Sequence, residues 1–151
     1  MVQLTYGAFM AGLKAATAAP SWPTINGDYF PQNLLHNSLI NDKINIHFIH
    51  RMLAYVLTGL MIFWHFKART VHTSPLFNRL KNVPLLLVSL QVILGIFTVL
   101  KSTILAKNGF GPFEYLAQAH QLIAMFLLMC MLLQWYLLRK TAESQLQDLP
   151  L

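Results

Sequence analysis

Two stretches decide how this chain folds, Asn45-Ile-His-Phe-Ile-His-Arg51 and Leu116-Ala-Gln-Ala-His-Gln121. Each lies near the start of a long apolar segment, and each carries a histidine, His50 or His120, about two helical turns inside that segment. A helix of about 20 apolar residues is long enough to cross the hydrocarbon core of a membrane. An imidazole in that environment is costly unless its ring nitrogens have partners, so both histidines are candidate functional residues.

The composition is that of an integral membrane protein. Of the 151 residues, 56% are hydrophobic and 11% are charged, and the mean hydropathy is +0.50. These values exclude an ordinary water-soluble domain. The formal net charge is +6, but the lysines and arginines stand at segment ends and form no stripe between aromatic residues. We therefore expect the lipid bilayer, and no nucleic acid, as the partner of this surface.

The sequence predicts an all-α integral membrane protein, a transmembrane helical bundle with three full spans and a partial or complete N-terminal helix. The predicted helices cover about residues 2–19, 44–66, 83–100 and 113–138. Together, residues 1–140 are predicted to form one transmembrane domain, followed by a polar, frayed tail over 141–151.

The first segment admits two interpretations. The small residues Thr17-Ala-Ala19 fit the cleavage site of a signal peptide, but Lys14 follows most of the apolar run, whereas a signal peptide carries its positive charge before it. Glycines and alanines spaced by four residues from Gly7 to Ala16 favour instead a membrane helix packed closely on a neighbour.

Basic residues in short loops predict the orientation. They gather after the second and the fourth predicted helix, at Lys67, Arg69, Arg79, Lys81, Arg139 and Lys140. Because lysine and arginine are in excess on the cytoplasmic side of membrane proteins, we expect these ends, and both termini, on the cytoplasmic side or its equivalent.

His50 and His120 are predicted to lie at the same depth in the membrane. His50 is six residues past Ile44 and His120 is seven past Phe113, so both lie roughly 10 Å from the outer ends of helices that run in the same direction. Two imidazoles facing each other at one level are what an axial pair of haem ligands requires. The alternative is a purely structural role as hydrogen-bonded helix contacts. For His47 we favour that role or an interfacial position over ligation.

A haem held by two histidines is six-coordinate and has no open position for substrate. Such a site transfers electrons or holds a cofactor structurally. We hypothesise that Arg51 neutralises a haem propionate and that Gln121 tunes the site through hydrogen bonds.

Five blocks, in order, resemble the C-terminal half of the haem A synthase family. They are Gly7-Ala-Phe-Met-Ala-Gly-Leu-Lys14, Trp22-Pro-Thr-Ile-Asn-Gly27 with Pro31, Phe48-Ile-His-Arg-Met-Leu-Ala-Tyr55, Gln91-Val-Ile-Leu-Gly-Ile96 and His120-Gln121. The resemblance implies a family with two similar four-helix halves, of which the second holds a b-type haem through the histidines matching His50 and His120. In the first half, a glutamate three residues before a ligand histidine is implicated in oxidising a methyl group of haem O to the formyl group of haem A.

Two features depart from the family pattern. His47 occupies the position three residues before His50, where the first half has its glutamate, and the 20–43 loop lacks the cysteine pair that some members carry. The catalytic residue therefore stays unassigned. The N-terminal half is also missing, which indicates a fragment, a misplaced start or a reduced relative.

The resemblance implies a haem A synthase-like membrane oxidoreductase, with haem O and haem A as substrate and product and haem b as cofactor. This chain would be the cofactor half, completed by an N-terminal half or a second copy into an eight-helix unit. The expected location is a bacterial plasma membrane or the mitochondrial inner membrane, with the termini on the cytoplasmic or matrix side. Two alternatives stay open: a small b-type electron-transfer cytochrome, and a haem-free assembly or scaffold subunit.

Overall fold

The computed structural model describes residues 1–32, 34, 38–71, 73–104 and 110–147. Its helices are α1 (Val2–Gly12), the 3₁₀ helix η1 (Ala15–Ala18), α2 (Lys43–Thr70), α3 (Pro75–Leu80), α4 (Val83–Leu100) and α5 (Pro112–Gln147). Within the described ranges no strand is formed, apart from an isolated bridge between Ile25 and Asp28. The predicted all-α class is confirmed.

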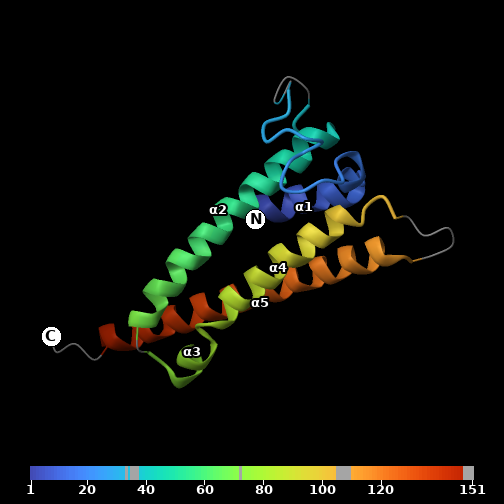
Figure 1. The fold of residues 1–151 in the computed structure, drawn as a ribbon. Helices are drawn as coiled ribbons and strands as arrows, with labels where there is room; N and C mark the ends of the chain where they lie inside the picture. The colour runs from blue at the N-terminus through green and yellow to red at the C-terminus, as the bar shows by residue number, and fades with distance from the viewer. Residues whose placement is uncertain (33, 35–37, 72, 105–109, 148–151) are drawn as a thin grey trace.

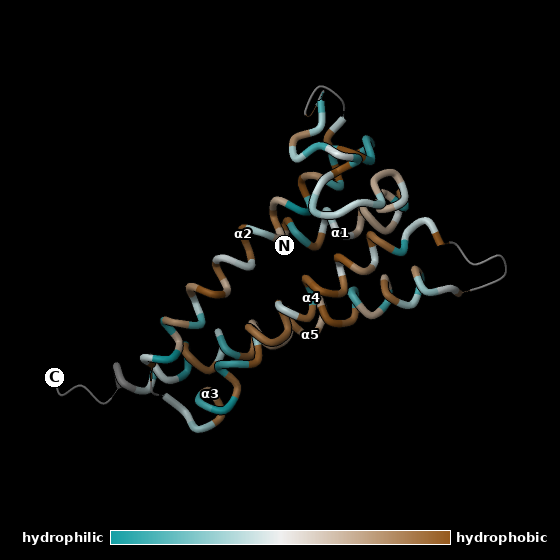
Figure 2. The backbone as a smooth tube through the Cα atoms, viewed as in Figure 1, coloured by the Kyte–Doolittle hydropathy of each residue, from teal (hydrophilic) through white to brown (hydrophobic). Residues whose placement is uncertain are grey.

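The long helices alternate in direction. The end that contains the loop before α2 is called the outer end here, and the end that contains α3 is called the inner end. α2 and α5 run from the outer to the inner end, and α4 returns between them, packed along α5 (Figure 1). α1 packs on the first half of α2. Three helical segments are long and apolar enough to cross a membrane: Lys43–Thr70, Pro75–Leu100 and Pro112–Ser144. In Figure 2 the apolar colour runs along the middle of α4 and α5, and hydrophilic residues gather around α3 and in the loop before α2.

The N-terminal helix is shorter than predicted. We expected a helix over residues 2–19, whereas α1 ends at Gly12, Lys14 adopts a left-handed conformation with φ 49°, and η1 follows. The 11 residues of α1 rise only about 16 Å, roughly half of a bilayer core. The turn at Lys14 is compensated by packing, because it brings Ala15 and Ala19 into fully buried positions.

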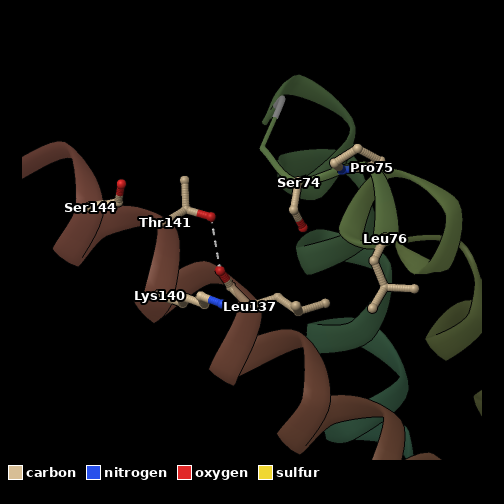
Figure 3. A pocket seen from close by; sticks show the side chains of 7 residues that line it. All are labelled: Ser74, Pro75, Leu76, Leu137, Lys140, Thr141 and Ser144. Atoms are coloured by element: carbon tan, nitrogen blue, oxygen red, sulfur yellow. Dashed lines mark hydrogen bonds between the residues drawn. The ribbon is translucent and has the colours of Figure 1, made fainter.

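The last helix is longer than predicted. We expected it to end near residue 138 before a frayed tail, but α5 continues to Gln147; residues 148–151 lie outside the described part of the chain. Arg139 Nε donates to Glu143 Oε1 at 2.7 Å, a charge pair one turn apart that supports a helix. Thr141 Oγ1 donates to the Leu137 carbonyl at 3.0 Å, as Figure 3 shows. The polar residues thus extend the helix.

The inner end contains a short helix that the sequence analysis missed. α3 begins where Ser74 Oγ accepts the Phe77 N–H and Pro75 fills the first turn. α3 lies beside the last turns of α5 and shares a pocket with it (Figure 3). Gln134 Nε2 donates to the Leu80 carbonyl at 2.8 Å and so ties α5 to the end of α3. The basic residues named above flank this end; which side of the membrane it faces stays a prediction.

The outer end contains a buried apolar cluster. Ala16, Val99 and Phe113 form a buried cluster with Met10 against it, which joins η1, α4 and α5. The buried hydroxyl of Ser102, just after α4, lies 3.0 Å from the Ala16 carbonyl and 2.7 Å from the Val99 carbonyl. These contacts fix the N-terminal segment against the α4–α5 pair, and they set the depth at which α1 meets α2.

We predict that Ser102→Ala lowers the free energy of unfolding by about 1 kcal/mol, because the Ala16 carbonyl loses a buried donor. The measurement is thermal unfolding in detergent, followed by circular dichroism. Ser89→Ala is the matched control, since Ser89 Oγ donates only to Leu85 of its own helix and is exposed. Equal effects of the two substitutions would contradict this account of the outer end.

Candidate functional site

His120, on α5, is held by two contacts from α4. Its Nδ1 lies 3.0 Å from the Gln91 backbone oxygen, and its Nε2 lies 3.1 Å from the Gln91 side-chain nitrogen Nε2. A carbonyl oxygen only accepts, so Nδ1 carries the proton and donates, and the unprotonated Nε2 accepts from the amide. This is the tautomer of a histidine that offers Nε2 to a metal, with its second nitrogen oriented by a backbone carbonyl.

His50, on α2, has a parallel contact with α1. Its Nε2 lies 3.4 Å from Nε2 of Gln3, so the second histidine also receives a glutamine amide from the preceding helix. Its Nδ1 is buried and has no hydrogen-bond partner in the structure. Oε1 of Gln3 and Oε1 of Gln91 are buried without a partner as well. Polar atoms left in this way indicate a place where a further polar or metal-bearing group is accommodated.

Glycines allow both imidazoles to lie against the neighbouring helices. A Cβ atom built on Gly95 would stand 3.0 Å from Cε1 of His120, and one built on Gly7 would stand 3.4 Å from Cε1 of His50. The first distance is shorter than ordinary carbon–carbon contact, so a side chain at position 95 would displace the ring. Each histidine therefore has a glycine that provides space and a glutamine one turn earlier that contacts Nε2.

His50 and His120 occupy corresponding positions near the starts of α2 and α5. His50 lies seven residues after Lys43 at the start of α2, and His120 lies eight residues after Pro112 at the start of α5. α2 and α5 run in the same direction (Figure 1). That the two imidazoles face each other at one level stays a prediction.

The donor set fits a haem better than a bare metal ion. In the described ranges no group of three or more histidine, cysteine, aspartate or glutamate side chains converges on one point. Two imidazoles alone are too few for an ordinary protein metal site, whereas a haem needs only two, since the porphyrin supplies four nitrogens to the iron.

Arg51 is fully engaged by the loop before α2. Nη1 donates to the carbonyls of Pro23 and Thr24, each at 3.0 Å, while Nη2 donates to the Ser21 carbonyl at 2.7 Å and to His47 Nε2 at 3.1 Å. Of the five guanidinium N–H groups, only the one on Nε is directed at none of these partners. The role of Arg51 toward a propionate stays a prediction, and it requires either this N–H or the release of loop carbonyls.

The same contacts give His47 a role. Its side chain is buried, and its Nε2 accepts from Arg51 one turn later on α2, which orients the guanidinium toward the loop. This agrees with a structural contact, one of the two roles that we favoured for His47.

Gln121 and His65 make no hydrogen bond to His50 or His120 in the described part of the chain. Gln121 is exposed on α5, and its contribution to the site stays a prediction. His65 lies at the inner end, where it lines an open pocket of about 530 Å³ with Arg69, Lys81 and Asn82.

Sequence reasoning missed four residues of the site. Gln3, Gly7, Gln91 and Gly95 contact the two imidazoles, yet none was named as a site residue. A signal was present, because the pattern Gln-x-x-x-Gly occurs in the helix before each histidine helix, as Gln3 to Gly7 and as Gln91 to Gly95. Four residues make about one helical turn, so the pattern places the glutamine and the glycine on the same face of the helix.

Comparison with known proteins places this arrangement in context. The model of the COX15-CtaA family, described as cytochrome oxidase assembly protein, matches residues 1–132. A protein of Flavobacterium johnsoniae named heme A synthase is 31% identical over 138 residues, covering 87% of this chain and 38% of that protein. A heme A synthase of Rhodopseudomonas palustris is 32% identical and covers 99% of this chain and 40% of that protein.

The chain thus spans about two fifths of the length of the curated relatives it matches. No solved structure matches the chain significantly.

We predict that Gly95→Ala destabilises the fold, although alanine is the better helix former by about 1 kcal/mol. To accommodate the new methyl group, the His120 ring has to shift by a few tenths of an ångström, which strains its two contacts with Gln91. Gly59→Ala is the control, because nothing lies within 4 Å of a Cβ at Gly59, so the substitution stabilises α2. Thermal unfolding of both variants gives the sign of each effect, and a stabilising Gly95→Ala would disprove the close approach.

We predict that Arg51→Lys releases the loop before α2, because an ammonium group cannot reach three carbonyls and His47 at once. The expected result is faster protease cleavage between residues 20 and 42 and a loss of about 2 kcal/mol in unfolding free energy. Arg69→Lys, an exposed change on the same helix, is expected to leave both unchanged. Equal cleavage rates for wild type and Arg51→Lys would show that Arg51 does not hold the loop.

Proposed function

This chain belongs to the COX15-CtaA family of cytochrome oxidase assembly proteins, and on that premise we propose that it serves haem A biosynthesis by holding one b-type haem between His50 and His120. The observation that carries the proposal is the corresponding position of His50 and His120 on two helices that run in the same direction, each with Nε2 close to a glutamine amide of a neighbouring helix. Relatives named heme A synthase match nearly the whole chain, which supports the biosynthetic role.

A haem held by His50 and His120 would supply reversible one-electron transfer. The residues of this chain determine how the group is held. The Gln91 carbonyl fixes the proton of His120 on Nδ1, so that Nε2 is available as a ligand without a change of tautomer. At the outer end, Arg51 and His47 hold the 21–24 backbone over the start of α2, which limits access of water to this part of the site.

We assign the oxidation of haem O to a larger assembly. The chain aligns with about two fifths of the length of its relatives. His47, at the position that corresponds to the glutamate of the first half, contacts Arg51. An N-terminal half or a second copy of the chain is the proposed partner. In that assembly this chain is the cofactor half of a haem A synthase-like oxidoreductase.

A small b-type electron-transfer cytochrome is the second candidate function. It is favoured by the position of both proposed ligands within one chain, so that haem binding requires no partner. The two functions differ in the product, because only the first converts haem O into haem A.

We predict that the purified chain in detergent binds haem with a low-spin, b-type reduced-minus-oxidised spectrum, and that His50→Ala and His120→Ala each abolish it. Loss of either imidazole leaves the iron with one axial ligand, which changes its spin state and weakens binding. His65→Ala is the control, since His65 lies at the inner end of α2, in the pocket with Arg69 and Lys81.

A wild-type chain that takes up no haem would overturn the proposal and favour a scaffold role. Haem binding that survives both substitutions would overturn the assignment of the ligands. To separate the two candidate functions, the chain is expressed with a matching N-terminal half and supplied with haem O. Formation of haem A supports the synthase role, and haem binding without conversion supports the cytochrome.

A further inference from the structure

Gln3 and Gln91 contact the equivalent atom, Nε2, of His50 and His120. Gln91 Nε2 lies 3.1 Å from Nε2 of His120, and Gln3 Nε2 lies 3.4 Å from Nε2 of His50. Each pair joins neighbouring helices, α4 with α5 and α1 with α2. The same contact thus occurs twice, each time from a glutamine four residues before a glycine. The repetition indicates that the two contacts serve the same purpose.

The chemistry of the contact excludes the reverse hydrogen bond at His120. If Nε2 of His120 carried the proton, its Nδ1 would be an unprotonated acceptor facing the Gln91 backbone oxygen at 3.0 Å, with lone pairs opposed. The amide must therefore donate to Nε2. The lone pair that accepts this hydrogen bond is the lone pair that binds iron, so amide and iron compete for one electron pair.

Each glutamine amide has a partner for its nitrogen but none for its oxygen. Oε1 of Gln3 and Oε1 of Gln91 are buried without a hydrogen-bond partner, which costs free energy. Each glutamine therefore satisfies the imidazole while its own acceptor is unsatisfied. Such a hydrogen bond satisfies the imidazole Nε2 when no metal is bound to it, and a stronger ligand displaces it easily.

We propose that Gln3 and Gln91 protect the two histidines in the haem-free chain, a role we call a latch. Their amides donate hydrogen bonds to Nε2 of each histidine and rotate away when iron binds there. The proposal rests on haem binding between His50 and His120, and it makes both glutamines positioning residues that control how readily haem enters. Without a latch, a bare imidazole nitrogen would be exposed to hydrocarbon before haem arrives, which is costly.

The test is a haem titration of the full chain in detergent, comparing wild type with Gln91→Leu and Gln3→Leu. Leucine keeps much of the side-chain volume and removes the amide. Because the competing hydrogen bond is lost, each variant is expected to bind haem about two- to tenfold more tightly and to keep the low-spin spectrum. Gln91→Ala, which removes the side chain altogether, is expected to shift affinity in the same direction.

Gln118→Leu is the matched control, since Gln118 is exposed on α5 two residues before His120. A second readout uses the haem-free chain: the ¹⁵N resonance of His120 Nε2 is expected to move toward that of an unbonded imine nitrogen in Gln91→Leu, and to stay in place in Gln118→Leu.

A merely structural glutamine would weaken haem binding when replaced, so equal or weaker binding in both leucine variants overturns the latch and leaves the haem site standing. An unmoved ¹⁵N resonance also overturns it. If neither wild type nor variants bind haem, the proposed function fails, and the latch fails with it.

Discussion

An imidazole inside a bilayer must have a partner for each of its ring nitrogens, and the arrangement around His120 follows from that constraint. Water is absent from the hydrocarbon core, so the partners come from protein backbone, amide side chains or a metal. Here α4 supplies both partners from one residue, with the Gln91 carbonyl on Nδ1 and the Gln91 amide on Nε2. Gly95 completes the contact, because the ring lies where a side chain would stand. The close packing of α4 on α5 is therefore also what sets the tautomer of a proposed iron ligand.

His50 meets this constraint at one nitrogen only. Its Nε2 faces Gln3 of a helix too short to span the membrane, and its Nδ1 has no hydrogen-bond partner in the structure. α1 ends at Gly12, and the buried alanines of η1, with Ser102 after α4, anchor it at the outer end. This anchoring holds Gln3 and Gly7 against His50. The outer end is thus packed for stability and at the same time positions α1 for the site, while the inner end is tied separately by Gln134 and α3.

The sequence predicted the parts of this fold that depend on hydropathy and length. The α4 segment was placed at its observed bounds, because that prediction rests on counting residues along an apolar helix. The pairing of His50 with His120 rests on the same kind of counting and stays a prediction. The end of α1 at Gly12 was missed, since its cause is burial of Ala15 and Ala19, which no local pattern shows. The extension of α5 was missed because polar residues were interpreted as a frayed tail.

The contacts of single side chains were the least predictable. Arg51 was expected near a propionate, yet its guanidinium binds backbone carbonyls 27 to 30 residues earlier, a separation that sequence patterns do not encode. Gln3 and Gln91 were overlooked because a glutamine in an apolar helix has many structural explanations. Only their repetition at the same spacing from Gly7 and Gly95, seen beside both imidazoles, distinguishes them.

The most direct test of the central claim is a pulsed electron paramagnetic resonance measurement on the oxidised, haem-loaded chain with ¹⁵N-labelled histidine. If His50 and His120 are the axial ligands, the low-spin ferric iron couples to two imidazole nitrogens of the protein, and the two couplings are of similar strength. Coupling to a single labelled nitrogen, or to none, would contradict the account.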